Sequence, residues 1–478
     1  MKPCLPGFLP ERLLVVLALT GLLAACAVGP EAERPALDVG VTWANLPADA
    51  AEGWVPAGEV PGAGTDPADA WRRFDDAVLD DMMARLEAQN FDLQRALAVA
   101  EQARAALRAS RSGLFPDLGV SASATRSGTR TTAESQFSLA GTVSWEPDLW
   151  GRVRRTVQAG EAGVRASQAD VQAMRLSLQS SLAQSYFRVR ALDAEADMMR
   201  RTVSAYERSL ALNRNRLTAG VGERADVSMA VTQLENARAQ LEALARQRRE
   251  LEHALAALQG RVPSQFTLAP VEGLLARVPA VPVGLPAQLL QQRPDVVAAE
   301  ERVRQAYAEI GVAQAAWFPD LSLSAQGGFR SGEWARWLSA PAQFWTLGPS
   351  LALSLLDGGA RRARVDEAWA RSDAQAAQYR QTVIDAVREV EDALAALDGL
   401  AREAAIQQRA LAAARETLAL THNQFAAGLI DYLSVVQVET SALSAERAAL
   451  TLKAEQLLAG VRLITALGGA WQGDFSGH

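Results

Sequence analysis

Apolar residues recur every seven positions over long stretches of the chain. One such row consists of Val227, Leu234, Leu241 and Leu255, and another of Val436, Leu443, Leu450, Leu457 and Ile464. Spacings of seven predict supercoiled helices that pack side by side. No proline occurs between residues 147 and 263 or after residue 349, and strong helix formers dominate both stretches. A helix from about residue 152 to 217 would extend roughly 100 Å and end near Gly220.

Four shorter segments alternate apolar residues or glycine with small or polar residues, the pattern of strands with two different faces. We expect these strands at about 118–126, 135–146, 320–330 and 344–356, with Pro349 marking an edge or a bulge in the last of them. Tryptophans lie in or beside the segments, and four of them form a predicted membrane girdle: Trp145, Trp150, Trp317 and Trp345. Aromatic residues at both ends of apolar-outward strands fit a membrane-spanning barrel, and a soluble β-sandwich is the alternative.

Four strands are too few to close a barrel, since single-chain barrels begin at about eight strands. An open sheet edge in lipid would leave backbone groups unpaired, at a cost of several kcal/mol for each group. If the strands span a membrane, several chains must therefore share one barrel. The strand count itself predicts an oligomer.

The chain repeats itself. The segment Phe-Pro-Asp-Leu occurs at 115–118 and again at 318–321, and Ala219-Gly220 matches Ala427-Gly428. These matches predict a tandem duplication, with a first repeat over 75–263 and a second over 288–468. We expect a hairpin turn at about 219–224 in the first repeat and at about 427–432 in the second. Residues 264–287 would link the repeats, and 469–478 would form a tail.

The N-terminus is predicted to be a signal peptide over residues 1–25, with positive charge followed by an apolar run too short to span a bilayer. Small residues precede Cys26, as in a bacterial lipobox, so we expect cleavage to leave Cys26 lipidated. An ordinary cleaved signal with an incidental cysteine is the alternative. Residue 27 is Ala rather than Asp, which resembles the sorting signal of bacterial lipoproteins for the outer membrane and not for retention in the inner membrane. Residues 26–74 would form an extended segment.

Composition argues against an enzyme. The formal net charge is −7, which disfavours a nucleic-acid partner, and only two lysines occur, neither of them following a glycine as a phosphate-binding loop requires. Three scattered histidines and two cysteines show no metal-ligand spacing. We therefore expect no catalytic residues, no cofactor and no metal.

A group of short motifs resembles the TolC-like outer-membrane efflux channels, and most closely their lipidated OprM/NodT branch. The motifs are Cys26-Ala-Val-Gly-Pro30, Trp71-Arg-Arg-Phe-Asp75, Phe115-Pro-Asp117, Trp145-Glu-Pro-Asp-Leu-Trp-Gly151, Arg293-Pro-Asp295, Phe318-Pro-Asp320, Leu356-Asp-Gly-Gly359 and Tyr432-Leu433. The resemblance implies a mostly α protein with long helical hairpins and four strands per chain, closed only as a homotrimer. It further implies a 12-strand outer-membrane barrel, a 12-helix periplasmic tunnel, and docking onto a periplasmic adaptor and an inner-membrane pump.

The resemblance places the functional region at the two hairpin turns. Gly220, Gly222 and Gly428 would shape the turns for adaptor docking, and Leu433 falls on the family's apolar constriction. A core leucine of the heptad pattern is the alternative for Leu433. The family's acidic residue one turn further on is replaced here by Gln437. Asp431, next to Tyr432 in the same predicted gate, could restore negative charge at the mouth.

Six arginines lie where strands give way to helices and form a predicted basic collar. They are Arg152, Arg154, Arg155, Arg361, Arg362 and Arg364. A collar at this level would meet anionic lipid head groups, and a salt-bridged helix start is the equal alternative.

Two other functions compete with small-molecule efflux. A duct for type I protein secretion shares the fold, and a periplasmic coiled-coil scaffold lipoprotein would explain the helices without the strands. Scarce methionine and histidine give no support to a metal-relay role.

Overall fold

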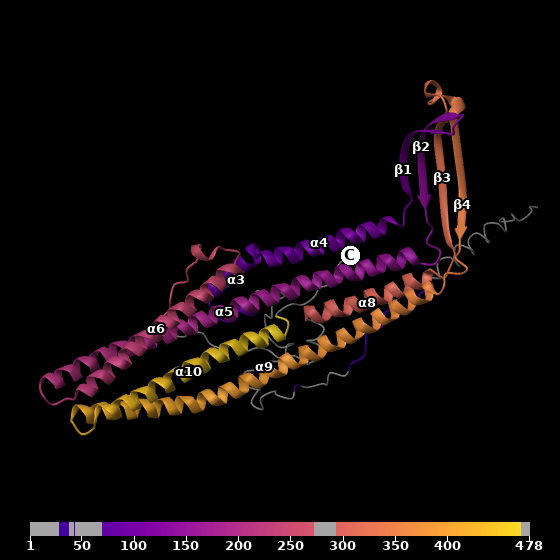
Figure 1. Ribbon diagram of the computed structural model, residues 1–478. Helices are drawn as coiled ribbons and strands as arrows, with labels where there is room; N and C mark the ends of the chain where they lie inside the picture. The colour runs from indigo at the N-terminus through magenta and orange to yellow at the C-terminus, as the bar shows by residue number, and fades with distance from the viewer. Residues whose placement is uncertain (1–27, 38–42, 44–68, 272–292, 470–478) are drawn as a thin grey trace, which may run out of the picture. The chain divides into compact units, whose positions relative to one another are not determined.

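The computed structural model describes residues 28–37, 43, 69–271 and 293–469 (Figure 1). The predicted signal peptide, Cys26, most of the predicted linker and the tail beyond residue 469 lie outside this range. The chain divides into two compact units. Unit 1 comprises 1–37, 98–169 and 297–381, and unit 2 comprises 38–97, 170–296 and 382–478.

Unit 1 contains a four-stranded antiparallel sheet in the order β1-β2-β3-β4 (Figure 1). The strands are β1 (Asp117–Gly128), β2 (Ala133–Trp145), β3 (Asp320–Ser331) and β4 (Gln343–Ala352). At about 3.4 Å per residue, a strand of 12 residues is about 40 Å long, which exceeds the roughly 30 Å core of a bilayer.

The register gives the sheet one apolar face. Residues paired across neighbouring strands lie on the same face, and Leu118 pairs with Val143, which in turn pairs with Ala325, whose partner is Leu347. The next row on this face joins Val120, Gly141, Gly327 and Trp345. The opposite face carries rows such as Ser121-Ala140-Gly328-Phe344 and Gly119-Thr142-Gln326-Thr346. The sheet therefore has an apolar side and a mixed, more polar side.

β4 is shorter than the alternation predicts. The ladder ends at Ala352, four residues before the predicted end at 356, because the chain leaves the sheet toward the turn at Asp357. β4 is also an edge strand of the described sheet, which is where a proline such as Pro349 is tolerated. The connection from β3 to β4 contains two short 3₁₀ turns, Trp334–Arg336 and Ala340–Ala342.

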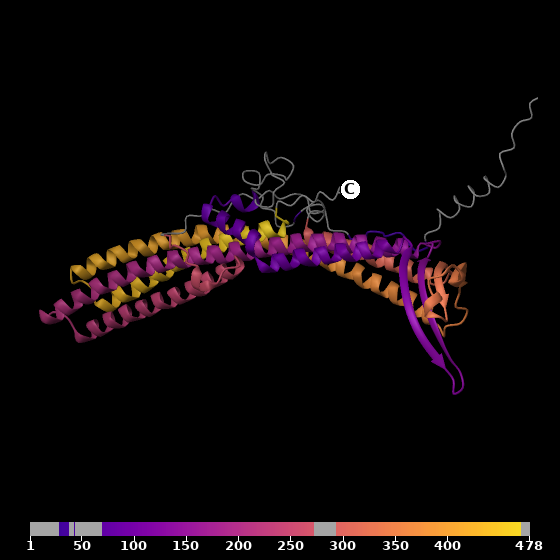
Figure 2. The same cartoon turned by 90° about the horizontal axis from the view of Figure 1, so that it is seen from above.

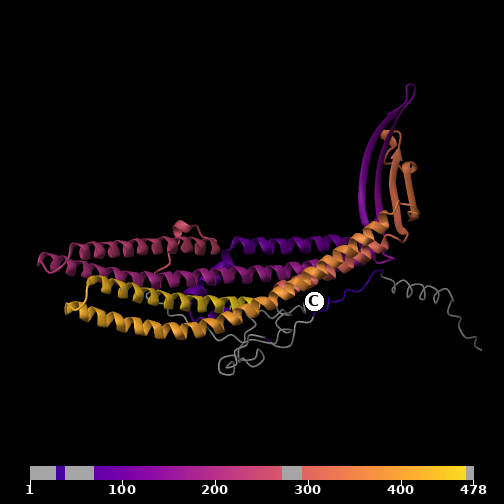
Figure 3. The ribbon, with the colours of Figure 1, turned by 60° about the horizontal axis from the view of Figure 1, so that its bottom comes forward.

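Unit 2 is built from two helical hairpins whose turns lie at the same end (Figures 1 and 2). The first hairpin joins α5 (Arg152–Thr218) to α6 (Arg224–Leu258), and the second joins α9 (Ala360–Ala426) to α10 (Tyr432–Ala466). Figure 3 shows each return helix running beside its partner. The long helices α5 and α9 also contribute their N-terminal parts to unit 1. None of the described helices combines the length and hydropathy needed to cross a bilayer.

The two halves of the chain have matching elements. α5 and α9 both have 67 residues, α6 and α10 both have 35, and α4 (Phe91–Ser112) and α8 (Pro294–Ala315) both have 22. α8 begins 203 residues after α4, and α10 begins 208 residues after α6. The mostly helical fold with long hairpins, four strands and a duplicated unit is therefore confirmed.

Short helices cover α5 in unit 2. Residues 69–72 form α2 (Asp69–Arg72), where the sequence pattern predicts extended chain, and α3 (Ala77–Gln89) follows. Trp71 is buried and donates its indole N–H to the side chain of Gln179 on α5 at 3.0 Å. The hydroxyl of Tyr186 donates to Asp76, whose other oxygen caps α3. These contacts fix the start of the first repeat onto its long helix.

Candidate functional site at the hairpin turns

Both hairpins end in the same backbone motif. Gly220 has φ +74°, its N–H donates to the carbonyl of Leu217 at 3.0 Å, and the next N–H, of Val221, donates to the carbonyl of Arg216 at 3.0 Å. In the second repeat Gly428 has φ +73° and donates to Phe425 at 3.0 Å, while Leu429 donates to Gln424 at 2.9 Å. This is the Schellman motif, which satisfies the last carbonyls of a helix and needs a left-handed residue. Both glycines therefore have a conformational role.

Gly222 is required for a different reason. A Cβ atom placed on it would lie 2.9 Å from the Cβ of Arg216 and 2.9 Å from the backbone nitrogen of Leu217. The first turn thus folds back closely onto the end of α5. The matching position in the second repeat is Ile430, so this close approach is a feature of the first turn only.

An exposed apolar side chain follows each turn glycine. Val221 is 68% exposed and Leu429 is 74% exposed. They occupy equivalent positions in the two Schellman motifs, where an apolar residue usually packs back onto the helix. Neither residue was predicted as part of the site, although the sequence repeats an apolar residue directly after each turn glycine. Together they give each turn a small apolar tip.

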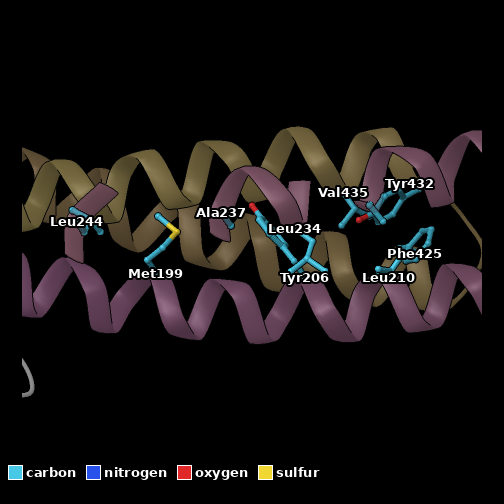
Figure 4. Close-up of a cluster of buried hydrophobic side chains, with 10 residues drawn as sticks. Met199, Tyr206, Leu210, Leu234, Ala237, Leu244, Phe425, Tyr432 and Val435 are labelled. Carbon is cyan, nitrogen blue, oxygen red and sulfur yellow. The ribbon is translucent and has the colours of Figure 1, made fainter. Parts of the chain in front are cut away.

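Beneath the turns, a buried cluster holds the two hairpins together (Figure 4). Its ten members come from all four long helices: Met199, Tyr206 and Leu210 of α5, Ala230, Leu234, Ala237 and Leu244 of α6, Phe425 of α9, and Tyr432 and Val435 of α10. The heptad row of α6 contributes small alanines beside leucines, so the helices approach closely. The cluster packs the base of each turn against the other hairpin.

Tyr432, predicted as part of the gate, belongs to this cluster. Only 1% of it is exposed, and its ring lies 5.7 Å from the ring of Phe425. The hydroxyl of Ser209 donates to its phenolic oxygen at 3.0 Å, and burial raises the pKa of the phenol. The guanidinium of Arg216 lies over the other ring, 4.7 Å from the centroid of Phe425. The ends of α5, α9 and α10 are thereby linked.

Asp431 is the N-cap of α10. Its carboxylate accepts hydrogen bonds from the hydroxyl of Ser434 at 2.6 Å and from the backbone N–H of Ser434 at 2.9 Å. These bonds lower the pKa of Asp431 below its usual value. The residue therefore stays ionised at the helix N-terminus, where negative charge is favourable. Its match in the first repeat, Glu223, makes no such side-chain cap.

Leu433 and Gln437 lie on the face of α10 that points away from the cluster. Leu433 is 47% exposed and Gln437, one turn further on, is also exposed, whereas Val435 between them is buried. Within this chain Leu433 is thus not a core leucine, which was the alternative to the gate. The structure brings Leu433 and Gln437 together and separates both from Tyr432.

A buried carboxylate lies below the cluster on α10. Glu439 is only 8% exposed, its Oε1 lies 3.4 Å from Nε2 of His422 on α9, and its Oε2 has no hydrogen-bond partner among the described residues. Burial raises the pKa of Glu439 to about 7. Burial, and secondarily the nearby Glu439, also raises the pKa of Tyr206 to about 12. No sequence pattern distinguished this glutamate from its many exposed neighbours.

The predicted collar arginines have mostly intramolecular partners. Arg152 pairs with Glu146 at 2.6 Å, Arg154 with Asp148 at 3.2 Å, and Arg361 with Asp357 at 2.7 Å. Arg362 and Arg364 are exposed, and Arg362 lies 4.0 Å from Asp366. Arg155 is different, because it is only 5% exposed and binds backbone carbonyls. The contacts agree with the salt-bridged helix start, and lipid binding by the collar stays a prediction.

The girdle tryptophans fall into two groups. Trp150 stacks on Phe318 at 4.8 Å, Trp145 donates its N–H to the carbonyl of Leu114 at 3.2 Å, and Trp317 carries Arg361 over its ring at 4.9 Å. All three lie at the end of the sheet where the helices begin. Trp345 is 82% exposed on the apolar face, toward the other end of β4.

The sequence pattern of the outer membrane efflux protein family matches this chain over residues 83–261 and 285–469. The chain belongs to this family. As a family member it is an efflux channel of the outer membrane, and its similar proteins are channels rather than enzymes.

Three members of the family show how far the likeness extends. Outer membrane protein OprJ of Pseudomonas aeruginosa is 31% identical over 98% of this chain and 96% of its own length. Cation efflux system protein CusC of Escherichia coli is 30% identical over 99% of this chain and 100% of its own. Pyoverdine export outer membrane protein OpmQ of Pseudomonas aeruginosa is 31% identical over 85% of this chain and 88% of its own.

Solved structures of efflux channels share the fold. The outer-membrane channel OprN superposes with a TM-score of 0.85 and 28% identity, covering 93% of this chain and 99% of that one. The open state of the Neisseria gonorrhoeae channel MtrE gives a TM-score of 0.80 with 27% identity over 93% and 98% of the two chains. The efflux-channel fold thus extends over nearly all of the chain.

Proposed function

We propose that three copies of this chain form one passive duct, with a 12-strand barrel in the outer membrane and a tunnel of helical hairpins in the periplasm. The duct would receive small molecules from a periplasmic adaptor and an inner-membrane pump of the resistance-nodulation-division type. The observation that carries the proposal is the sheet of unit 1, which has one coherent apolar face and two edge strands. A sheet of this kind needs its apolar face covered and its edges paired, and lipid around a closed barrel provides both.

The strand order explains how copies would close. Because the four strands alternate in direction, β4 of one copy can pair antiparallel with β1 of the next. This contact joins two different surfaces, so it repeats head to tail and ends only when the ring closes. Three copies give twelve strands, within the range of known membrane barrels.

The cargo is proposed to be small. CusC is named for cation efflux and OpmQ for pyoverdine export, and both names refer to small solutes. These names favour small-molecule efflux over the alternative of a type I protein-secretion duct. The apolar tips at Val221 and Leu429, held by the Schellman glycines, are the proposed docking points for the adaptor.

The assembly is tested by mass and by gel migration. The purified protein should have the mass of a trimer in detergent, should migrate differently before and after heating, and should incorporate radiolabelled palmitate at Cys26. A Cys26→Ala variant should lose the label, so lipidation can be tested independently of barrel formation. A monomer that stays soluble without detergent would refute the channel and support the scaffold alternative.

The gate at Leu433 has its own test. A Leu433→Ser variant should raise the conductance of the closed channel in planar bilayers several-fold, since a polar residue at an apolar constriction lets water and ions enter. Leu420, on α9, is a matched control because it is exposed to a similar degree, at 56%. If Leu433→Ser leaks no more than Leu420→Ser or the wild type, Leu433 is not the gate.

A further inference from the structure

The first described residues of the chain are bound to the start of α5. The N–H of Val28 donates to the carbonyl of Trp150 at 3.1 Å. In return Arg155 donates from Nε to the carbonyl of Val28 at 3.1 Å and from Nη2 to the carbonyl of Gly29 at 3.0 Å. Its third nitrogen donates to Gln158 at 3.0 Å. Arg155 is thus a buried cation whose hydrogen bonds hold two consecutive peptide groups.

Two glycines make this contact possible. Gly29 has φ +115°, and a Cβ atom on it would lie 2.5 Å from the Cα atom of Gly311 on α8. A Cβ atom on Gly311 would in turn lie 2.9 Å from the side chain of Arg155. Backbone atoms cannot move aside as a flexible side chain can, so the segment fits only while residue 29 lacks a side chain. The N-terminal segment is therefore wedged between α5 of the first repeat and α8 of the second.

A second attachment follows five residues later. Arg34 donates from Nε to the hydroxyl of Tyr379 on α9 at 2.9 Å and lies 3.4 Å from Glu300 on α8. Residues 28–37 thus contact helices from both repeats, all within unit 1. The side chain of Glu31, between the two attachments, is 92% exposed. Its ion pair with Arg155 at 3.6 Å therefore contributes little to the stability of the attachment.

We propose that Val28, Gly29 and Arg34, with Arg155, Gly311 and Tyr379, form a clasp that fastens the N-terminus across both repeats at the base of the strands. Cys26, the predicted lipidation site, stands two residues before Val28 in the sequence. The clasp would therefore restrain the stretch of chain that directly follows the predicted acyl group. Its role in anchoring rests on the function proposed above, whereas its contacts do not.

The clasp is tested first by proteolysis of the chain in detergent-solubilised outer membranes, in which the periplasmic side is open to the protease. A glutamate-specific protease should cleave after Glu31 or Glu33 only slowly in the wild type, because both ends of that short segment are held. Gly29→Ala, Gly311→Ala and Arg155→Lys should each accelerate cleavage at least tenfold, read from the new N-termini by mass spectrometry. Gly348→Ala is the control, since a Cβ atom there meets nothing within 4 Å. Equal cleavage in clasp variants and control would refute the clasp.

The anchoring role is tested by a double-mutant cycle on the yield of heat-modifiable trimer. Gly29→Ala should lower the trimer yield several-fold in the acylated chain, and it should have little further effect in a Cys26→Ala background. Independent, multiplicative losses would mean that the clasp only stabilises the fold, which would overturn its anchoring role. If the wild type takes up no palmitate but Glu31 is still cleaved only slowly, the proposed lipidation is refuted and the clasp is supported. Arg155→Lys gives a milder version of the same test, since lysine keeps the charge but cannot bind both carbonyls.

Discussion

Replacing Gly220 and Gly428 together with valine is expected to abolish efflux while the trimer still assembles. Both glycines have φ near +74°, where a β-branched residue is a strong outlier that costs about 2 kcal/mol or more. A Cβ atom at either position meets nothing within 4 Å, so the defect is conformational rather than a clash. The Schellman bonds would be lost, and the apolar tips at Val221 and Leu429 would leave the positions proposed for adaptor docking.

The measurement is drug resistance in cells that lack their own channel, where the double variant should give at least a tenfold lower inhibitory concentration than the wild type. Gly399→Val is the matched control, since Gly399 lies inside α9 with open space around it and without a positive φ. This control should keep resistance within about twofold of the wild-type value, because valine is a better helix former than the glycine it replaces. Loss of the trimer in the double variant would show that the turns serve folding instead of docking.

Replacing Glu439 with glutamine is expected to remove most of the pH dependence from the packing of the two hairpins. Burial raises the pKa of Glu439 from 4.5 to about 7, so the packed state disfavours the ionised carboxylate. The packing is most stable below about pH 4.5, and it loses up to about 3 kcal/mol as the pH rises to 7 and above. The titratable groups that face the carboxylate are His422, whose Nε2 lies 3.4 Å from it, and the phenols of Tyr206 and Tyr432.

Hydrogen exchange measures this effect in peptides from the ends of α9 and α10, at about pH 5.5 and pH 8 after correction for intrinsic exchange. Wild-type protection should fall as the pH rises, whereas Glu439→Gln should stay protected at both values. Glu416→Gln, at an exposed site on α9, should behave like the wild type. A wild type equally protected at both pH values would mean that Glu439 stays ionised in the packed state.

The long helices could be predicted from sequence because their signals are local. Proline-free stretches with heptad spacing and a terminal glycine place the first long helix at 152–217, and the structure gives Arg152–Thr218. The last strand was predicted less well, since Leu353 and Leu355 continue the alternation although the ladder stops at Ala352. Alternation describes one strand, whereas the end of a ladder depends on the partner strand.

The roles of individual side chains depended on contacts between distant segments. In the sequence Arg155 cannot be distinguished from the other collar arginines, yet in the structure it binds the carbonyls of Val28 and Gly29. Tyr432 and Leu433 are adjacent in the sequence, but helix geometry turns one into the cluster and leaves the other exposed. Such distinctions need the tertiary structure, because neither composition nor spacing records which helix face is covered.

The two edge strands of the sheet also have a genetic consequence. In the proposed ring each copy is recruited through β1 and β4, far in sequence from the hairpin turns, so a copy with defective turns still enters rings with normal copies. When the two kinds are made in equal amounts and mix at random, only about one trimer in eight contains normal copies alone. Defects in the turns should therefore be dominant over the normal gene, whereas defects that block edge pairing should be recessive.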